Sequence, residues 1–268
     1  MSGFGNGDEL ERISARDYMA YETASTNSNW RVASGYGALV SSSIPGEVEV
    51  SLRTPIEEIR VEGERLEIRT PLGTLWPRSL IVTVSTNVIA GDLIAWPDKL
   101  QSWQEAASCL PLGNNEKLFL EIVGGGFELE THVIGNPTDA ETGSYYLRPM
   151  GLPVIECFLG GARARSTSRT RADEAFERAL DELRSLLGSA ACASLKPLVS
   201  SDWTNTPWIG GAYSHALPLH SGARLRLATP FQDRIFVAGE ATHPTDFSTA
   251  HGALENGIRA AGEVLNSF

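Results

Sequence analysis

A strand followed by a glycine, an acid and a helix gives this sequence its clearest chemical signal. The strand is the apolar run Arg234–Ala238, which delivers Gly239 and Glu240 to the edge of a sheet. A carboxylate there can accept hydrogen bonds from sugar-like hydroxyl groups. The helix that begins after Phe247 directs free N–H groups and its positive dipole end toward a ligand. The alternative is an ordinary strand–helix unit with a surface glutamate.

Aromatic side chains in the segment Trp203–Ser214 form a second pattern. Trp203 and Trp208 are followed by a Gly-Gly-Ala sequence and Tyr213. An aromatic face attracts a cation, and it is also a flat apolar surface along which an amine can approach a reacting centre. Core packing is the alternative, because tryptophan and tyrosine most often serve that purpose.

A lysine at the start of a strand is the third pattern. The sequence Gly113-Asn-Asn-Glu-Lys117 comes directly before the apolar stretch Leu118–Val123. A lysine is usually a solvated surface residue. The pattern therefore gains meaning only in company with the other two.

Taken together in their order along the chain, the lysine motif, the two-tryptophan segment and the C-terminal strand and helix resemble the flavin-containing amine oxidases. That family includes the monoamine and polyamine oxidases and the related histone demethylases. The run Phe236–Ala261 is similar to the C-terminal FAD-binding signature of that family. Trp203–Ser214 is similar to its two-tryptophan segment, and Gly113–Lys117 to its Gly-Asn-x-x-Lys. A weaker likeness joins Thr54–Ile59 to the strand whose backbone meets the adenine. The resemblance spans residues 20–265.

The resemblance implies FAD as cofactor and a small-molecule amine as substrate. The carbon beside the amine nitrogen would lose a hydride equivalent to give an imine, and oxygen would reoxidise the flavin. Lys117 is implied to be catalytic through a water at flavin N5. Tyr213 and Thr249 would contact the substrate. The implied cofactor contacts are Ile56, Trp203, Trp208, Gly239, Glu240, Thr249 and Ala250.

The chain departs from the family pattern at two places. Thr249 stands where the monoamine oxidases have a second aromatic residue, which favours the polyamine oxidase and demethylase branch. The tripeptide Ser85-Thr86-Asn87 replaces the family's Pro-Leu-Gly turn. An L-amino-acid oxidase is an alternative, but it needs an arginine that clamps the substrate carboxylate, and none can be assigned from the sequence. A non-catalytic interaction module that retains the fold is another alternative.

The dinucleotide-binding unit of the family is not found in this sequence. That unit needs a strand, GxGxxG, a helix and an acid about 20 residues further on. Gly3, Gly5 and Gly7 lack a preceding strand, and Gly35 and Gly37 lack a third glycine. We therefore expect a truncated form, a subunit complemented by a polypeptide with the GxGxxG unit, or a degenerate homologue.

Composition limits the possible classes of function and the expected cellular location. A net charge of −11 argues against nucleic acid as partner. Cys109, Cys157 and Cys192 form no CxxC pair, and the five histidines show no HxH or HExxH spacing, so neither a disulfide framework nor a metal site is predicted. The polar N-terminus and the absence of a long apolar run predict no signal peptide and no membrane span. We expect a cytoplasmic protein.

The element pattern predicts an α/β (mixed α and β) protein, in which part of an FAD-binding doubly wound domain is interleaved with a mixed-sheet substrate domain. The expected portions are 1–29 (N-terminal helix and loop), 30–88 (FAD domain), 89–202 (substrate domain) and 203–268 (C-terminal FAD-domain portion). Helices are predicted over 8–22, Ser102–Cys109, 171–187 and Thr249–Leu265. Strands are predicted over Val48–Leu52, Ile56–Val61, Arg65–Thr70, Leu80–Val84, Leu118–Val123, Ser144–Leu147, Val154–Leu159 and Arg234–Ala238.

Overall fold

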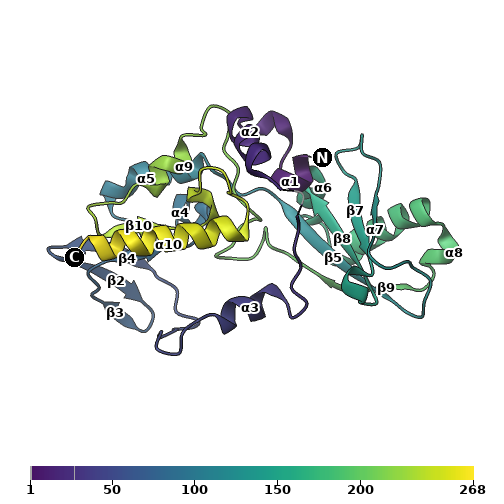
Figure 1. The fold of residues 1–268 in the computed structure, drawn as a ribbon, viewed down its shortest axis with the longest axis horizontal. Coiled ribbons are helices and arrows are strands. Elements are labelled where there is room, and N and C mark those ends of the chain that lie inside the picture. Colours follow the sequence, from purple (N-terminus) through teal and green to yellow (C-terminus); the bar gives the residue numbers. More distant parts are fainter. Residues whose placement is uncertain (1, 27) are drawn as a thin grey trace.

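The computed structural model describes residues 2–26 and 28–268, which form two lobes (Figure 1). One lobe holds the C-terminal helix and a short parallel strand pair, and the other holds a five-stranded sheet. Helices α1 (Ser2–Asn6) and α2 (Ala15–Ala24) lie over the junction between them. The predicted mixed α and β class is confirmed, and the four portions expected along the chain stay a prediction.

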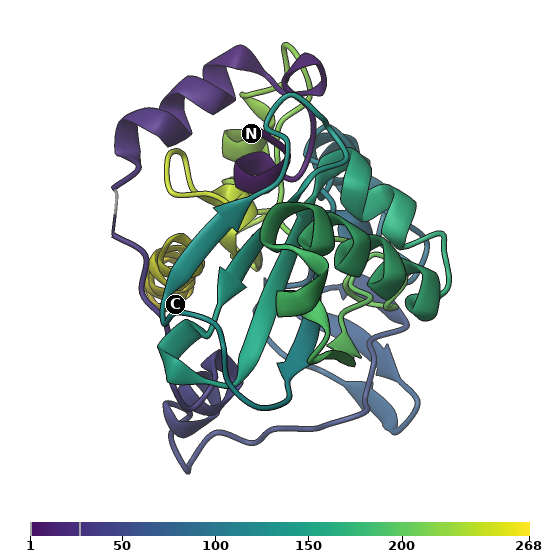
Figure 2. The ribbon, with the colours of Figure 1, turned by 90° about the vertical axis from the view of Figure 1, so that its right-hand side faces the viewer.

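The five-stranded sheet is antiparallel and has the strand order β6-β7-β8-β5-β9. Helix α7 (Ala172–Leu187) covers one face, which Figure 2 shows in front of the strands. Its apolar residues recur at helical spacing and are buried against the sheet. The strands are β5 (Asn115–Ile122), β6 (Thr131–Ile134), β7 (Gly143–Leu147), β8 (Val154–Gly160) and β9 (Leu195–Ser200).

Alternation along β5 separates a core face from an open face. Leu118 and Leu120 are buried in the cluster under α7. Lys117 and Phe119 point to the opposite face, because successive side chains of a strand alternate. Lys117 pairs with Phe158 of β8 and Phe119 pairs with Glu156. Charged and aromatic side chains of both strands therefore meet on the open face.

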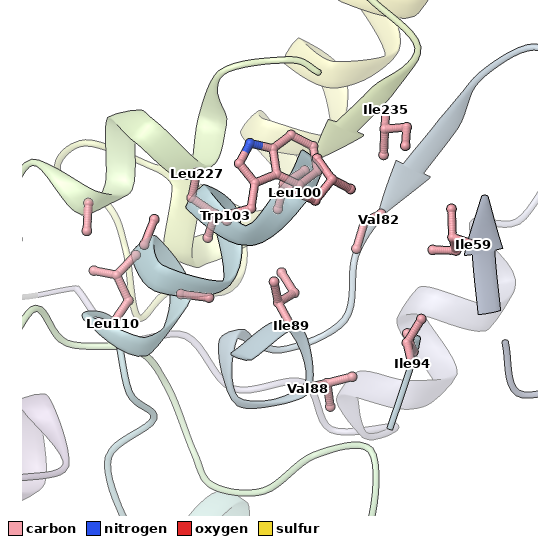
Figure 3. Packing of buried hydrophobic residues seen from close by; sticks show 14 of the residues in the cluster. Ile59, Val82, Val88, Ile89, Ile94, Leu100, Trp103, Leu110, Leu227 and Ile235 are labelled. Atoms are coloured by element: carbon pink, nitrogen blue, oxygen red, sulfur yellow. The ribbon is translucent and has the colours of Figure 1, made fainter. Parts of the chain in front are cut away.

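The other lobe is built around the parallel strands β4 (Leu80–Val82) and β10 (Ile235–Val237). Beneath them, helices α4 (Thr86–Ala90), α5 (Gln101–Ser108) and α9 (Ala223–Ala228) supply the core shown in Figure 3. Helix α10 (Ala250–Asn266) packs on β10 through Ala260. The antiparallel strands beside this core are β1 (Glu58–Glu62), β2 (Arg65–Thr70) and β3 (Gly73–Leu75).

The long segment between α2 and β1 is mostly exposed in its described residues. Helix α3 (Tyr36–Ser42) has no buried residue, and Trp30 is 92% exposed. The strand predicted over Val48–Leu52 is wrong, since this stretch forms turns without a partner strand. Alternation alone does not make a strand when no neighbour offers hydrogen bonds. Helix α10 also exposes an apolar stripe of Leu254, Ile258 and Leu265.

Other predictions need smaller corrections. The helix expected over 8–22 is a 3-10 turn at Leu10–Arg12 followed by α2, which begins after the N-cap Ser14. The acids before it bind elsewhere: Asp8 and Glu9 both bind Arg165, and Glu9 also accepts from the amide of Ala162. Strand β5 begins at Asn115, before the predicted start. In β4, expected to be covered on both faces, Leu80 and Ile81 stay partly exposed.

Several short elements were not predicted: α1, α3, β3, α4, β6, β9 and α9, together with α6 (Gly161–Thr167) and α8 (Ser189–Cys192). All of them run for seven residues or fewer, too short for a periodic signal. Within the described ranges, no helix has both the length and the apolar character needed to cross a bilayer.

Candidate active site

Lys117 belongs to an ion-pair cluster on the open face of the five-stranded sheet. Its Nζ donates to Oε1 of Glu156 at 2.6 Å, and Nη1 of Arg31 donates to Oε2 at 2.6 Å. The Glu156 side chain is 6% exposed, whereas that of Lys117 is 42% exposed. Burial by itself raises the pKa of Glu156, but the hydrogen bonds from Lys117 and Arg31 outweigh it, so the pKa lies below its usual value. We call these three residues the Lys117 cluster.

Aromatic rings lie beneath both cations of the Lys117 cluster. The Nζ of Lys117 is 5.5 Å from the ring centroid of Phe158, and the guanidinium of Arg31 is 4.8 Å from that of Tyr146. Tyr146 in turn stacks on His132 with the ring centroids 4.1 Å apart. These distances are those of cation–π contacts, which hold a cation without neutralising it.

Tyr213 is joined to the start of the lysine strand. The amide of Gly113 donates to the carbonyl of Tyr213 at 2.8 Å, and the amide of Ala212 donates to the carbonyl of Gly113 at 2.9 Å. The Tyr213 hydroxyl donates to the carbonyl of Phe4, and burial raises the pKa of this phenol. The Phe4 ring packs on Phe158, the ring under the lysine. The N-terminal segment thus lies between Tyr213 and the Lys117 cluster.

The N-terminal glycines serve this close packing. Gly7 has φ +72° and would bring a Cβ within 2.8 Å of Gly113 Cα. A Cβ on Gly3 would lie 3.3 Å from the backbone of Gly160 and of Gly161. Gly3 and Gly7 therefore allow backbone-to-backbone packing, whereas a Cβ on Gly5 would meet nothing within 4 Å.

A buried glutamate in the lysine motif holds the two-tryptophan segment. Glu116 accepts hydrogen bonds from the amides of Trp203 and Thr204 at 3.2 and 3.0 Å and from the Ser201 hydroxyl at 2.6 Å. Trp203 and Trp208 remain 46% and 38% exposed, and Trp208 has a left-handed φ of +68°. Both tryptophans are thus partly exposed and lie outside the hydrophobic core, and Glu116 fixes the backbone of Trp203.

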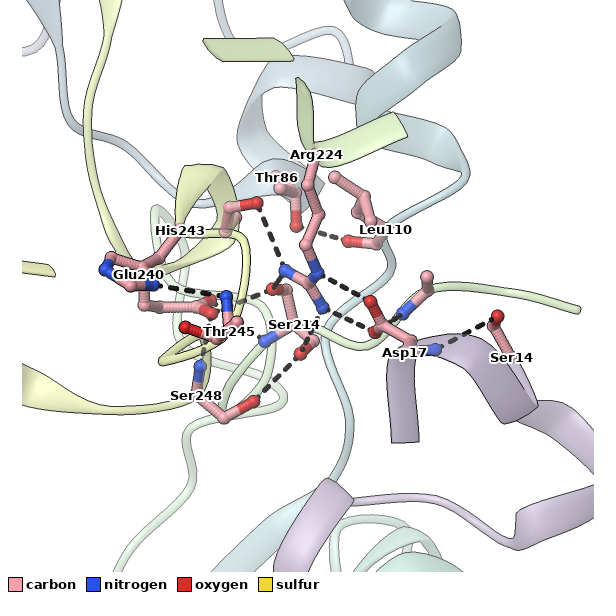
Figure 4. Close-up of polar contacts among 12 residues, drawn as sticks. Ser14, Asp17, Thr86, Leu110, Ser214, Arg224, Glu240, His243, Thr245 and Ser248 are labelled. Carbon is pink, nitrogen blue, oxygen red and sulfur yellow. Dashed lines mark hydrogen bonds and ion pairs between the residues drawn. The ribbon is translucent and has the colours of Figure 1, made fainter. Parts of the chain in front are cut away.

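Glu240 ties the tyrosine segment to the C-terminal helix (Figure 4). Its carboxylate accepts from the amide of Ser214 at 2.9 Å, the Ser214 hydroxyl at 2.8 Å and the amide of Ser248 at 2.7 Å. The Ser248 hydroxyl donates back to the Ser214 carbonyl at 3.0 Å. Since a carboxylate has about four acceptor positions, only about one remains for the sugar hydroxyl expected there.

A buried ion pair stands behind this network. Nε and Nη2 of Arg224 donate to the two oxygens of Asp17 at 2.9 and 2.8 Å, and both side chains are 3% exposed. Nη1 of Arg224 donates to the Ser214 hydroxyl, and its guanidinium lies 3.6 Å from the ring centroid of Phe247. We call Asp17, Arg224, Ser214, Glu240 and Ser248 the Glu240 network.

The remaining predicted contacts lie on the lobe that holds helix α10. Thr249 is the N-cap of α10, and its hydroxyl accepts from Gly252 and donates to the Asp246 carbonyl. Ala250 begins the helix and is exposed, and Gly239 has φ +136° after β10. Ile56 packs on the core beside β1. The capping of Thr249 engages the hydroxyl that was expected to meet substrate, and all these assignments stay predictions.

The helix terminus also gathers His243, Asp246 and Glu255, whose side-chain ligand atoms lie within 4.8 Å of one another. The histidine nitrogens are already engaged. Nδ1 accepts from the amide of Asp246 at 2.7 Å, and Nε2 is 2.9 Å from Oε2 of Glu255. This histidine closes the loop before α10, and the geometry gives no reason to assign a metal to it.

Sequence reasoning missed four residues that organise these regions. Glu156 had a signal, because it is an acid inside the apolar strand sequence VIECFLG. Glu116 lay inside the lysine motif without a role. Asp17 and Arg224 had no signal, since they are 207 residues apart and surrounded by ordinary helical sequence.

Comparison with known proteins supports the resemblance. The family model described as flavin containing amine oxidoreductase matches residues 4–265. Lysine-specific histone demethylase 1 homolog 2 of Arabidopsis thaliana is 28% identical over 198 residues, which cover 70% of this chain and 26% of that protein. Peroxisomal N(1)-acetyl-spermine/spermidine oxidase of Bos taurus is 32% identical over 133 residues, 46% of this chain and 26% of that protein. The chain thus spans about a quarter of the length of these relatives.

A solved structure of putrescine oxidase bound to putrescine shares the fold. It superimposes with a TM-score of 0.63 at 17% identity and covers 80% of this chain and 48% of that one. The family match implies FAD as the cofactor.

The described residues fit one end of FAD. At the start of α10, no acceptor for the amides of Ala250 and His251 lies among the described residues, so both can meet a negatively charged ring edge. None of the described strand-to-helix junctions carries the GxGxxG sequence, and the Gly160-Gly161 junction before α6 is contacted by Gly3 and Glu9. The start of α10 is therefore where the ring end of FAD would fit, and this assignment stays a prediction.

Proposed function

We propose, from the premise that this chain belongs to the flavin-containing amine oxidoreductase family, that it supplies the substrate-facing part of an enzyme that oxidises a polyamine-like amine. One observation carries the proposal: the three sequence motifs are physically joined. Gly113 of the lysine motif binds the backbone of Tyr213, and Glu240 of the C-terminal signature binds the adjacent Ser214. The three motifs, which would act on the same substrate, are thus linked to one another by hydrogen bonds.

The proposed reaction is the oxidation of a C–N bond. FAD takes up a hydride equivalent from the carbon beside the amine nitrogen when it is bound. The nitrogen loses a proton to give an imine, and dioxygen accepts the two electrons and two protons as hydrogen peroxide. Water then hydrolyses the imine to a carbonyl compound and an amine. Lys117 would hold a water through its ammonium, and the Tyr213 ring would form one wall for the substrate.

The complementing part of the cofactor site is also a proposal. A seven-residue helix such as α3 is marginal in water unless it packs on something. The exposed stripe of α10, the unburied α3 and the two-stranded β4–β10 sheet would all be covered by a unit that adds strands and the GxGxxG turn. We propose that such a unit complements this chain, in the same polypeptide or in another. The proposal also includes location in the reducing environment of the cytoplasm, which the three free cysteines support.

Mixing experiments test the proposal. The purified chain is incubated with FAD, alone and with a polypeptide that carries a GxGxxG βαβ unit, and then gel-filtered. The chain alone should retain little flavin, because the pyrophosphate hydrogen bonds it lacks contribute about 1.5–3 kcal/mol each. The mixture should elute yellow and produce peroxide from diamines and polyamines. Stoichiometric FAD on the chain alone would mean that this chain also binds the pyrophosphate, and it would contradict the need for a complementing unit.

One observation keeps the L-amino-acid oxidase alternative in the test. Arg31 lies in the Lys117 cluster, is about one-third exposed on its side chain, and uses only Nη1 on Glu156. A guanidinium has five N–H donors, so a substrate carboxylate could still be bound. Peroxide from amino acids but not from polyamines would favour this alternative. Flavin binding without turnover of either class would favour the non-catalytic module.

A further inference from the structure

Glu156 is an unusual residue for its place. It stands in the middle of β8, between the buried Ile155 and Cys157, and its side chain is almost fully buried. A buried carboxylate is strongly disfavoured unless it is paired. Arg31 alone would provide that pairing, with Nη1 at 2.6 Å from Oε2. The second ion pair, to Lys117, is therefore more than the burial of this acid requires.

The geometry shows what the second ion pair does. Lys117 is paired with Phe158 across the two strands. Glu156 lies two residues before Phe158 in β8, on the same face of the sheet and opposite Phe119. Across that diagonal, Oε1 of Glu156 holds Nζ of Lys117 at 2.6 Å while the Phe158 ring lies beneath the ammonium. A long, flexible side chain that is 42% exposed is thereby kept in one orientation.

We propose that Glu156 is the positioning residue for Lys117: it anchors the ammonium on the open face of the sheet, on the side where Phe4 links Phe158 to Tyr213. The proposal rests on the proposed function, in which Lys117 holds a water for amine oxidation. Arg31 keeps the anchoring carboxylate compensated, so that Lys117 is oriented by Glu156 without being its only counterion. Glu156 itself contacts neither substrate nor cofactor in this proposal.

The first experiment measures the hold of Glu156 on Lys117 without any turnover. The chain has three lysines, Lys99, Lys117 and Lys196, so trace labelling with acetic anhydride and mass spectrometry reports all of them at once. Glu156→Gln should raise the labelling rate of Lys117 about threefold, as expected for release of a half-exposed ion pair. The other two lysines should keep their rates. Glu121→Gln, on the exposed part of the same strand β5 and opposite Lys196 of β9, is the matched control and should leave the Lys117 rate unchanged.

Arg31→Gln separates anchoring from shielding. With Arg31 gone, the carboxylate belongs to Lys117 alone, so the labelling rate of Lys117 should not rise. An unchanged Lys117 rate in Glu156→Gln overturns the proposal, and so does an equal rise in Arg31→Gln, which would mean that the segment around Arg31 merely covers the lysine. Should Glu156→Gln fail to fold, Glu156→Asp keeps the charge but shortens its reach, and a raised Lys117 rate there gives the same support.

The second experiment uses the FAD-loaded, complemented enzyme. Glu156→Gln should lower kcat about tenfold with little change in KM, and the loss should vanish in a Lys117→Met background, because two residues that act as a unit are not additive. An equal loss in both backgrounds overturns the proposal. Wild-type turnover in Lys117→Met instead refutes the role of the lysine in the proposed function, a failure that the labelling result distinguishes from loss of the anchor.

Discussion

The Glu240 network and the Lys117 cluster are each organised by a carboxylate, but they hold different things. Glu240 accepts from two backbone amides and one hydroxyl, so it fixes the chain itself. Glu156 accepts from two long cationic side chains at an open face. The first arrangement is backed by the buried ion pair of Arg224 and Asp17, whereas the cations of the second, Lys117 and Arg31, have side chains that are 42% and 34% exposed. We infer that stability is concentrated in the first region and adjustable chemistry in the second.

The largest effect that this comparison predicts is at the buried ion pair. Arg224→Met leaves Asp17 buried without its partner, and breaking such a pair costs about 3–5 kcal/mol. The free energy of unfolding, measured with urea, should fall by that amount. Arg184→Met, which removes the exposed pair with Asp181, is the matched control and should change it by less than about 0.5 kcal/mol. Equal effects would mean that the Glu240 network is not where stability lies.

A pH effect on stability comes next and arises beside the same network. His215 is 1% exposed, and among the described residues neither ring nitrogen has a hydrogen-bond partner, with Oδ2 of Asp8 3.6 Å from Nε2. Burial lowers its pKa from 6.5 to about 4, with Arg224 acting in the same direction. Because the folded pKa lies below the unfolded one, the neutral form favours the fold. The stabilisation is full above pH 6.5 and is lost as the pH falls toward 4, by about 3 kcal/mol in all.

The measurement is a series of urea titrations between pH 7 and pH 4. His215→Leu should flatten the curve in this window. Glu9, whose pKa is lowered from 4.5 to about 2, begins to lose its contribution only below about pH 4.5, so the histidine dominates the comparison above that pH. An unchanged slope in His215→Leu would place the acid sensitivity elsewhere.

A pair of matched substitutions compares the two carboxylates directly. Glu240→Gln keeps one acceptor oxygen but turns an amide toward donors, so it should destabilise the protein by about 2 kcal/mol. It should also speed hydrogen exchange at the amides of Ser214 and Ser248. Glu156→Gln releases side chains that are partly solvated and should cost less than about 1 kcal/mol. A reversed order of the two effects would contradict the assignment of stability to the Glu240 network.

The same contrast explains what the sequence could reveal. Helix α7 and strand β2 were predicted because their periodicity is strong and local. The stretch Val48–Leu52 alternates as well, but it has no strand to pair with, and a pairing partner is a tertiary fact. The joining of Gly113 to Tyr213 also depends on loop backbone contacts. The contact between Glu156 and Lys117 could be found only after β5 and β8 were known to be neighbours.

The smallest expected effect on stability is at Lys117. In Lys117→Met, Glu156 keeps its ion pair with Arg31, so no carboxylate is left buried and unpaired. The methionine stem still covers the Phe158 ring. The melting temperature should therefore stay within a few degrees of wild type, since a surface substitution typically changes stability by about 0.5 kcal/mol or less.

Activity should respond in the opposite way. In the complemented, FAD-loaded enzyme, Lys117→Met should slow amine oxidation or flavin reoxidation more than about tenfold, because no other ammonium lies over Phe158 in the described part of the chain. Lys196→Met, on the neighbouring edge strand β9, controls for loss of a lysine from the same sheet and should keep wild-type turnover. A variant that is stable but slow would separate the chemistry of the open face from the stability of the Glu240 network. Wild-type turnover in Lys117→Met would contradict a catalytic role for this lysine. The water-holding role would then belong to another residue on the open face.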